Sequence, residues 1–489
     1  MNTSGISARP DTIAAVATAP GAGGVGVIRI SGPLAKHLLE RIFRPSSPRF
    51  AGFVPRKMHH GHIVDDRGGT LDDVLTVFFP GPHSFTGEDV AEIHGHGGPA
   101  LLHTVLDAVL DADISATSGA EGGRVRMAER GEFTRRAFLN GRMDISQAEA
   151  VAELIASPGA ESARLASAKL EGLLGKRVSE LRDRLEYLRQ RVCLAVDFPE
   201  EESECLPPAE FAAVAGEVAD ALRGLLAAYE RARIWREGAL VALVGQVNAG
   251  KSSLMNALLG RPRAIVTECP GTTRDYLEEE CRILGLPVRL VDTAGLREGS
   301  EDPIEREGMR RGREKMQEAG LVILVLDGER LAALSERECD LALRAELEAL
   351  DGVDCSRRVA VWNKADLAPL SPELRNRAEQ TLGMICLPLS ARTGHGLEEL
   401  CSLLAGKVRG GNASGPDEGE IAPNRRQARV LEQALSELTE LKREIAAHIP
   451  PDLCGLRLDT ACVHLGEVIG LNSTEETLNA IFADFCIGK

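Results

Sequence analysis

The sequence predicts a multidomain α/β protein. It combines an N-terminal α+β domain, a discontinuous all-α helical domain, and a doubly wound α/β domain inserted between the two helical halves. Strand-like runs with helical patterns between them occupy residues 1 to about 120, apolar residues at a 3.6-residue period dominate 148–236 and 422–469, and short apolar runs alternate with helical patterns over 239–405. With 489 residues and 44% hydrophobic content, the chain can bury several cores.

Changes in composition place the domain boundaries. We expect the N-terminal domain over 1–130, the first helical half over 131–236, the inserted domain over 237–408 and the second helical half over 409–489. The glycine-rich stretch 410–419 marks the second junction, because such stretches are typical of linkers.

Composition and charge restrict the class of protein. A net charge of −16 disfavours a broad electrostatic grip on nucleic acid, so any RNA contact is expected to be local or shared with a partner. The eleven cysteines form no Cys-x-x-Cys pair and are expected to be reduced thiols. Neither a bilayer-spanning apolar stretch nor a signal-peptide pattern is present, so we expect a cytoplasmic protein without a membrane span.

A G-x-G-x-x-G sequence at Gly21–Gly26 invites comparison with dinucleotide-binding loops. The residues that follow it, Val27–Ile30, form a strand pattern rather than the start of a helix. Because a dinucleotide loop needs a helix N-terminus facing the phosphates, we interpret the glycines as a connection between two strands. Further strands are predicted at Leu75–Phe79 and Val90–Ile93.

Histidines and carboxylates cluster in the segment 85–98. His94 and His96 are two residues apart and would share one face of a strand, so a metal site is one interpretation. No third ligand stands at a recognisable spacing. A hydrogen-bonded polar turn or pocket is therefore the favoured alternative.

Two separated stretches predict long amphipathic helices. Apolar periodicity runs through 148–192 and 208–236 in the first half, and through 422–449 and 453–469 in the second. Ser473-x-x-Glu476 has the form of a capping box and predicts the start of a last helix.

The inserted domain begins with a phosphate-binding pattern. The apolar run Ala239–Val244 predicts a buried strand, which is followed by Gly245-x4-Gly250-Lys251-Ser252 and a helical pattern. A glycine turn that opens a helix directs backbone N–H groups and the positive end of the helix dipole at one spot. Lys251 adds charge for the outer phosphates, and the Ser252 hydroxyl is placed to bind Mg²⁺.

Polar motifs after the following strands indicate which nucleotide binds. Asp292-Thr-Ala-Gly295 places a carboxylate for the magnesium ion and a glycine N–H for the last phosphate. In Asn363-Lys-Ala-Asp366 the Asp366 carboxylate can accept from guanine N1–H and N2–H, a donor pair that adenine lacks. The backbone of Ser390-Ala391 can close over the guanine oxygen. The sequence therefore predicts GTP binding.

Hydrolysis needs an oriented water and charge neutralisation as well. Ras-like enzymes carry glutamine where this chain has Leu296, and an apolar side chain cannot polarise water. Asn248 can help to bind a monovalent cation, and the segment 271–275 supplies Thr272 and Thr273 as oxygen ligands. Carboxylates between Glu298 and Glu307 are candidates to orient the water.

Motifs in the same order along the whole chain resemble the MnmE (TrmE) family of tRNA uridine 5-carboxymethylaminomethyl modification GTPases, within the TrmE-Era-EngA-like P-loop GTPases. The resemblance runs from about residue 11 to 489. The motifs are Asp11–Ile13, Phe85–Asp89, His96–Gly98, Ala137–Asn140, Asp197–Pro199, Asn248–Ser252, Gly271–Asp275, Asp292–Arg297 and Cys486–Lys489.

The resemblance implies an N-terminal domain that binds tetrahydrofolate and forms a homodimer. The cofactor would be 5-formyl- or methylene-tetrahydrofolate. It also implies a potassium-activated GTPase domain and a partner, the FAD protein MnmG (GidA), with which the family modifies C5 of the wobble uridine in tRNA.

The resemblance also implies a set of site residues. Potassium would be held by Asn248, Thr267, the Cys269 carbonyl and Thr272, and magnesium by Ser252 and Thr273. Catalytic roles fall on Glu305, Arg274 and Cys486. Folate contacts fall on Arg29, Glu92, Arg142 and Lys489. The implied GTP-binding residues are Asn248, Ala249, Gly250, Lys251, Ser252, Ser253, Thr267, Glu268, Cys269, Pro270, Gly271, Thr272, Thr273, Asp292, Thr293, Ala294, Gly295, Asn363, Lys364, Asp366, Ser390 and Ala391.

Two other functions stay open at this point. A ribosome-assembly GTPase of the Era or EngA type would use the same nucleotide switch, but the acidic balance and the lack of a basic RNA-binding module count against it. A folate-dependent one-carbon transferase whose GTPase domain only regulates differs in where the chemistry takes place.

Overall fold

The computed structural model describes residues 11–112, 125–197, 208–260, 278–292, 312–408, 419–447, 451–483 and 485–488. It divides into two compact units. The first comprises Met1–Glu153, Ser167–Arg223 and Asn424–Lys489, and the second comprises Leu154–Ala166 and Gly224–Pro423. Among the described helices, none combines the length and apolar character that crossing a membrane requires.

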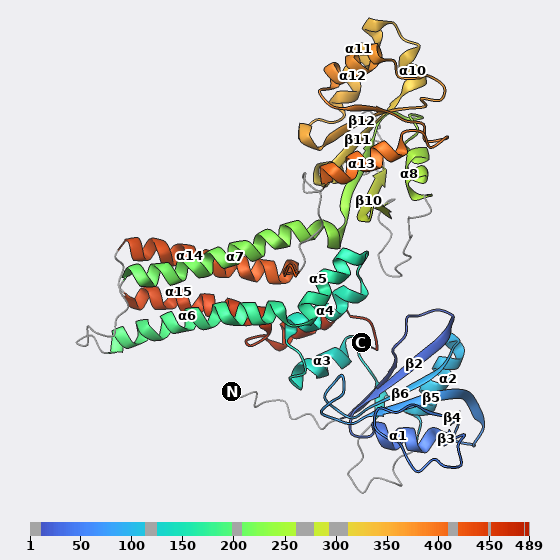
Figure 1. The fold of residues 1–489 in the computed structure, drawn as a ribbon, viewed down its shortest axis with the longest axis vertical. Helices are drawn as coiled ribbons and strands as arrows, with labels where there is room; N and C mark the ends of the chain where they lie inside the picture. Colours follow the sequence, from blue (N-terminus) through green and yellow to red (C-terminus); the bar gives the residue numbers. More distant parts are fainter. Residues whose placement is uncertain are drawn as a thin grey trace, which may run out of the picture. The chain divides into compact units, whose positions relative to one another are not determined.

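The first unit contains a seven-stranded sheet in the order β3-β4-β5-β6-β2-β1-β7, antiparallel except for the parallel pair β1–β7 (Figure 1). The strands are β1 Thr12–Val16, β2 Gly23–Ser31, β3 Phe43–Pro45, β4 His59–Val64, β5 Thr70–Phe79, β6 Val90–Gly97 and β7 Val125–Met127. The helices α1 (Ala35–Ile42) and α2 (Pro99–Leu110) bury apolar residues against one face of the sheet. A strand rather than a helix N-terminus follows Gly21, as predicted, but only Gly21 lies in the connection between β1 and β2, because Gly23, Gly24 and Gly26 already belong to β2.

An ion-pair cluster joins the sheet to the helix α3 (Glu132–Leu139). Arg126 on β7 contacts Asp11 at 2.7 Å and Glu132 at 2.6 Å. Arg136, one turn along α3, contacts the same two carboxylates at 2.7 and 2.9 Å. The first residues of α3 are thereby fixed to the end of the sheet.

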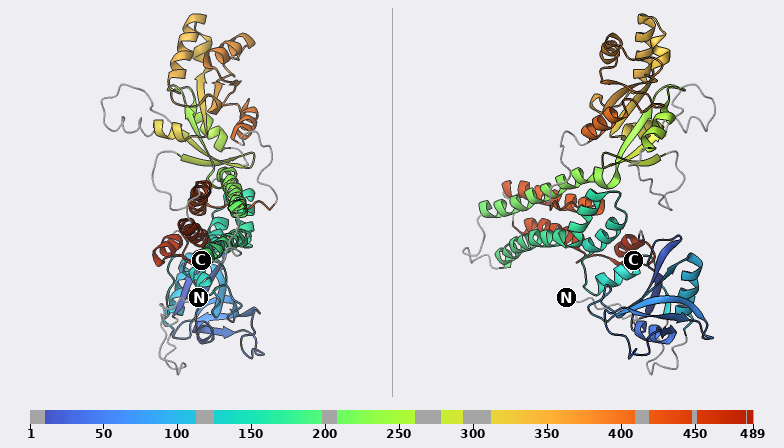
Figure 2. Two further views of the ribbon diagram at one scale, coloured as in Figure 1. Left: turned by 90° about the vertical axis from the view of Figure 1, so that its left-hand side faces the viewer. Right: turned by 45° about the vertical axis from the view of Figure 1, so that its right-hand side comes forward.

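Long helices form the rest of the first unit. Within that unit α15 packs against both α6 and α14 (Figure 1 and Figure 2). Leucines at helical spacing on α6, namely Leu181, Leu185 and Leu188, are fully or almost fully buried. The helical elements that lie wholly or partly in this unit are α4 Ile145–Ile155, α5 Ala160–Leu170, α6 Leu173–Asp197, α7 Pro208–Glu237, α14 Arg425–Ala446, α15 Pro451–Ile469 and α16 Glu475–Ala483.

The capping box predicted at Ser473 is wrong by one residue. The helix α16 begins at Glu475, and the Thr474 hydroxyl accepts from the Thr477 N–H at 3.2 Å. Ser473 Oγ is buried without a hydrogen-bond partner in the described part of the chain. Threonine therefore satisfies the helix N-terminus that the serine was expected to cap.

The second unit contains a six-stranded sheet in the order β13-β12-β11-β8-β10-β9, parallel except for the antiparallel edge strand β9. Alternate residues of β8 point into two cores. Val241 and Leu243 pack with α8 and α13, whereas Ala242 and Val244 pack with α11 and α12, so the sheet is doubly wound as predicted. The elements are β8 Ala239–Val244, α8 Lys251–Leu259, β9 Glu278–Ile283, β10 Leu286–Asp292, β11 Leu321–Asp327, α10 Gly328–Ala332, α11 Glu336–Glu348, β12 Arg358–Asn363, α12 Pro372–Leu382, β13 Cys386–Pro388 and α13 Leu397–Val408.

The two chain passages of the second unit are tied together. Arg236, near the end of α7, donates to the carbonyl oxygens of Ala422 and Pro423. Five residues earlier, Arg231 Nε donates to Glu420 Oε1 at 3.0 Å.

Candidate nucleotide-binding site

The loop between β8 and α8 requires glycine at two positions. Gly245 has φ 148°, and a Cβ atom there would lie 2.3 Å from the Val325 carbonyl oxygen. Gly250 has φ 95°, and a Cβ atom there would lie 2.2 Å from Asn363 Nδ2. Larger residues would collide with the neighbouring strand ends, so the sequence allows the tight turn that aims α8 at the loop.

Lys251 lies inside this turn. Its side chain is buried, and Nζ donates to the carbonyl oxygens of Gly245 at 2.8 Å and Gln246 at 2.9 Å. It is also the first residue of α8, whose N-cap residue, Gly250, provides no side-chain hydrogen bond. The uncapped N–H groups, the helix dipole and the ammonium group together favour an anion at this loop.

Ser252 and Asp292 form a pair suited to a divalent cation. The Ser252 hydroxyl donates to Asp292 Oδ2 at 3.1 Å, because β10 runs parallel to β8 and ends beside the loop. The other carboxylate oxygen, Asp292 Oδ1, is buried and has no hydrogen-bond partner among the described residues. A carboxylate and a hydroxyl are ligands that Mg²⁺ prefers, so these residues fit a magnesium ion.

Asn363 connects the phosphate-binding loop to the loop after β13. Its side chain is buried. Nδ2 donates to the Ala249 carbonyl oxygen at 2.8 Å, and Oδ1 accepts from the Ala391 N–H at 3.1 Å. The adjacent Lys364 contacts Asp327 Oδ2 at 2.7 Å. The motifs predicted at separate strand ends therefore meet at one edge of the sheet.

The Asp366 carboxylate lies at the same edge of the sheet and acts as a hydrogen-bond acceptor. Its Oδ1 accepts from the Ser390 hydroxyl at 2.7 Å, and this hydrogen bond, with help from Arg392, lowers the pKa of Asp366. Arg392 Nη2 contacts Oδ2, and its side chain is 74% exposed. Sequence reasoning missed Arg392, although a cation directly after Ser390-Ala391 was a visible signal.

A second polar group lies on the sheet of the first unit. Arg29 and Glu92 face each other across β2 and β6, with Arg29 Nε 2.9 Å from Glu92 Oε1. Phe85 and Phe133 hold the Arg29 guanidinium over their rings at 5.4 and 5.8 Å. His94 Nε2 lies 3.1 Å from Glu92 Oε2. Burial alone would raise the pKa of Glu92, but His94 and Arg29 outweigh it and lower the pKa.

Other predicted residues approach the same region. Arg142 Nε donates to the Ser84 carbonyl oxygen at 3.0 Å, beside Phe85. The C-terminal tail packs against β1, since a Cβ atom on Gly488 would lie 2.2 Å from the Val16 carbonyl oxygen. Cys486 in that tail is an exposed free thiol, and its carbonyl oxygen accepts from the Gly131 N–H at 3.4 Å.

The two histidines have carboxylate partners. His96 Nδ1 lies 2.7 Å from Asp72 Oδ1, and His94 contacts Glu92. In the portion that the structure describes, no group of three His, Cys, Asp or Glu side chains is placed to hold a metal ion. The contacts therefore agree with the hydrogen-bonded alternative rather than with a metal site.

Family models cover most of the chain. The model described as "MnmE helical domain" matches residues 145–486, and the model described as "GTP-binding protein TrmE N-terminus" matches residues 12–142. The chain belongs to the MnmE family of tRNA modification GTPases.

Named MnmE proteins agree along nearly their full length. The "tRNA modification GTPase MnmE" of Nitratidesulfovibrio vulgaris (strain DP4) is 51% identical over 486 residues, covering 98% of this chain and 99% of that protein. The protein of the same name from Lawsonia intracellularis is 47% identical over 481 residues, covering 98% and 100%. Among solved structures, the G domain of the T. maritima FeoB iron transporter is 27% identical with a TM-score of 0.26, covering 35% of this chain and 98% of its own.

Membership of the MnmE family makes this chain a GTP hydrolase of tRNA modification. Asn248 and Ser253 are exposed in the structure, and Asn248 has φ 65°. Several other residues that the resemblance implied for an MnmE protein lie outside the part of the chain that the structure describes. The residues outside it are Thr267, Glu268, Cys269, Pro270, Gly271, Thr272, Thr273, Arg274, Thr293, Ala294, Gly295, Glu305 and Lys489.

Proposed function

We propose that this MnmE-family enzyme is a potassium-activated GTPase that, with the FAD protein MnmG, installs the (carboxymethyl)aminomethyl group at C5 of the wobble uridine in tRNA. GTP hydrolysis would be coupled to domain rearrangement in a cytoplasmic homodimer. Residues 237–408 would act as the GTPase domain. The observation that carries the proposal is the convergence of Lys251, the Ser252–Asp292 pair and Asp366 at one sheet edge.

The described residues support binding of guanine nucleotide with magnesium. Lys251 and the N–H groups of α8 would hold the outer phosphates, and the ionised Asp366 would accept from guanine N1–H and N2–H. Ser252 and Asp292 would hold Mg²⁺ together with Thr273, and the ion would neutralise charge on the phosphate oxygens.

Potassium activation rests on Asn248, which is exposed within the phosphate-binding loop and carries a carboxamide oxygen suited to a cation. Thr267, the Cys269 carbonyl and Thr272 would complete the site. Glu305 would orient the water, because Leu296 cannot, and Arg274 would assist.

The N-terminal proposal is a folate site formed by Arg29, Glu92, Arg142 and Lys489. A lowered pKa keeps Glu92 ionised, so its oxygens can accept from the N–H groups of a pteridine ring. His94 and Phe85 would belong to this site as well, because they contact Glu92 and Arg29. Cys486 would take part in the modification chemistry, since its tail packs on β1 beside the strand that carries Arg29.

Mass spectrometry of wobble uridines tests the proposal. In a strain lacking this chain, tRNA should lose the C5 modification, wild type should restore it, and Lys251→Ala should not. Unchanged nucleosides in the deletion strain would overturn the proposal. Restoration of the modification by Lys251→Ala would instead favour the one-carbon transferase with a regulatory GTPase domain. The Arg29–Glu92 pair is the observation that supports this second function.

A further inference from the structure

One stretch of the first unit is strongly basic in an acidic chain. Residues 36–57 contain six lysines and arginines against a single glutamate, whereas the whole chain has a net charge of −16. The basic residues are Lys36, Arg41, Arg44, Arg49, Arg56 and Lys57. A local concentration of positive charge is the electrostatic feature that proteins use to contact nucleic acid.

The basic side chains are accessible and mostly unpaired with carboxylates. All six are exposed or half-exposed. Within the described residues, only Lys36 has a carboxylate partner, Glu40 at 3.7 Å, and both side chains of that pair are 45% exposed. Arg44 and Arg56 donate instead to backbone carbonyl oxygens. The stretch therefore presents uncompensated positive charge to solvent.

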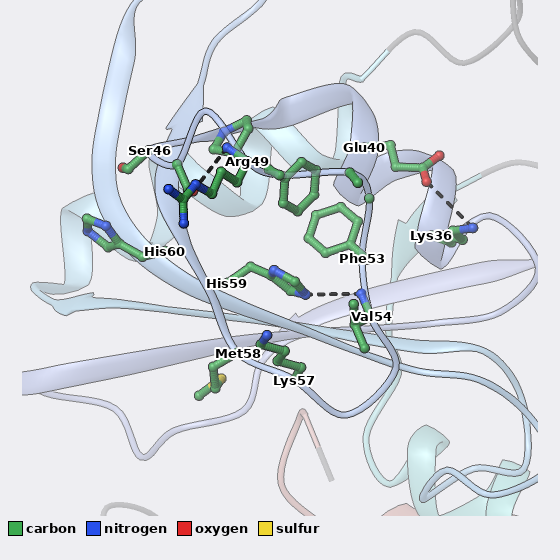
Figure 3. A pocket seen from close by; sticks show the side chains of 15 residues that line it. Lys36, Glu40, Ser46, Arg49, Phe53, Val54, Lys57, Met58, His59 and His60 are labelled. Carbon is green, nitrogen blue, oxygen red and sulfur yellow. Dashed lines mark hydrogen bonds and ion pairs between the residues drawn. The ribbon is translucent and has the colours of Figure 1, made fainter.

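A pocket of about 830 Å³ opens within this stretch, lined by α1, β3, the start of β4 and the segment 46–58. Figure 3 shows Phe53 and His59 in its middle, with Arg49, Lys36 and Lys57 around them. The half-buried rings of Phe50 and His59 lie 5.2 Å apart and nearly perpendicular. The pocket thus combines aromatic surface at its centre with cations and one carboxylate, Glu40, at its margin.

His59 does not offer its Nε2 to an anion. That nitrogen accepts from the Val54 N–H at 3.1 Å and therefore donates no hydrogen there (Figure 3). His60 lies 2.7 Å from the Asp73 carboxylate. Attraction for an anion therefore comes mainly from Arg49 and Lys57, since Lys36 is paired with Glu40.

We propose that this basic pocket, defined by Lys36, Arg49, Phe50, Phe53 and Lys57, is an RNA contact site that docks a phosphate-linked nucleotide of the tRNA substrate. The proposal rests on the proposed function, which supplies tRNA as the substrate. Cations track the phosphates and the rings contact a base, which is how proteins bind unpaired nucleotides. An acidic peptide would use the cations but leave the rings without a planar partner.

Single charge reversals in the full-length chain test the proposal. Arg49→Glu and Lys57→Glu are each expected to weaken tRNA binding about tenfold, measured by fluorescence anisotropy, and to make the salt dependence shallower by roughly 0.7 to 0.9 in log–log slope per lost phosphate contact. The matched control is Arg67→Glu, an exposed arginine in the turn at the other end of β4. It changes net charge equally and should alter binding less than twofold.

A second variant separates stacking from charge. Phe50→Leu keeps apolar volume against Phe43 and Phe53 but removes the ring. It should weaken tRNA binding several-fold without changing the salt slope. All variants should keep wild-type GTP turnover, since none touches the nucleotide site.

Three results would overturn the pocket assignment. The first is equal tRNA affinity of Arg49→Glu and Arg67→Glu, and the second is no tRNA binding by the wild-type chain. The third uses poly-glutamate as a probe for an acidic peptide: the charge-reversal variants would lose affinity for poly-glutamate but keep their affinity for tRNA. The proposed function survives each of them if deletion of the chain still removes the wobble modification. Only unchanged nucleosides in the deletion strain would remove both.

Discussion

Asn363 Nδ2 donates to the carbonyl oxygen of Ala249 at 2.8 Å, which joins the end of β12 to the loop between β8 and α8. The same carboxamide accepts from Ala391, so one buried side chain sets the distance between the two ends of the nucleotide site.

Replacing Asn363 should therefore remove the hydrogen bonds to both the phosphate-binding loop and the loop after β13. Asn363→Ala leaves the Ala249 carbonyl oxygen and the Ala391 N–H without partners, at about 1–3 kcal/mol for each buried group. We expect a lower free energy of unfolding and at least about tenfold weaker GTP binding in calorimetry. Asn256→Ala, at an exposed position of α8, is the matched control. Equal affinity of the two variants would contradict this role.

Base specificity should follow Asp366. In Asp366→Asn the carboxamide NH₂ can donate to the C2 carbonyl oxygen of xanthine while its oxygen accepts from N1–H. We expect GTP affinity to fall at least about tenfold and xanthosine triphosphate to become the preferred nucleotide. Fluorescence competition with both nucleotides measures the ranking. A variant that still prefers GTP would refute the assignment.

Cation dependence should follow Asn248. GTP turnover of the wild type is expected to rise strongly in potassium over sodium, and Asn248→Lys should abolish the difference, because a fixed ammonium group replaces the ion. Phosphate release in matched salts measures both. Asn256→Lys adds the same charge on α8 and should keep the potassium effect. Equal wild-type rates in the two salts would remove the cation hypothesis.

Glu305 should affect chemistry rather than binding. Glu305→Ala is expected to lower turnover at least about tenfold while leaving GTP affinity within twofold, because orienting water matters only in the transition state. Single-turnover kinetics with nucleotide titration separate the two quantities. Glu318→Ala, at an exposed position outside the segment of candidate carboxylates, is the control. A large loss of affinity would point to a structural role.

The loss of folding stability at low pH should depend on Glu132. Burial alone would raise its pKa, but hydrogen bonds from Arg126, the Glu129 N–H and Arg136 lower the pKa to about 2. Since the folded pKa is below the ordinary value of 4.5, the stabilisation is complete above pH 4.5 and is lost as the pH falls towards 2.

Glu132→Gln should accordingly lower the free energy of unfolding by on the order of 2 kcal/mol at pH 7 and by much less at pH 3. Urea unfolding at the two pH values measures this, and the exposed Glu129→Gln serves as control. A difference from wild type that is the same at both pH values would rule out the ionised carboxylate as the cause.

Local sequence predicted the nucleotide unit well where one face or both faces of an element are buried. The strand β8 is six consecutive buried residues between a helix and glycine, so its pattern is unambiguous. The edge strand β9, Glu278–Ile283, is absent from the prediction because three glutamates and partial exposure give it no apolar run.

Side-chain partners were much harder to predict. Arg29 and Glu92 are 63 residues apart and meet only because the strand order places β6 beside β2. Composition carries no information on that order. The pairing of Arg392 with Asp366 likewise depends on two loops whose approach is fixed by β12 and β13.

The hydrogen bonds from Arg236 to the carbonyl oxygens of Ala422 and Pro423 hold the two ends of the nucleotide unit next to each other. The entropic cost of bringing the two ends of a chain segment together grows only slowly with the length of the segment. A few hydrogen bonds at the junction can therefore hold together the ends of an inserted unit of this length.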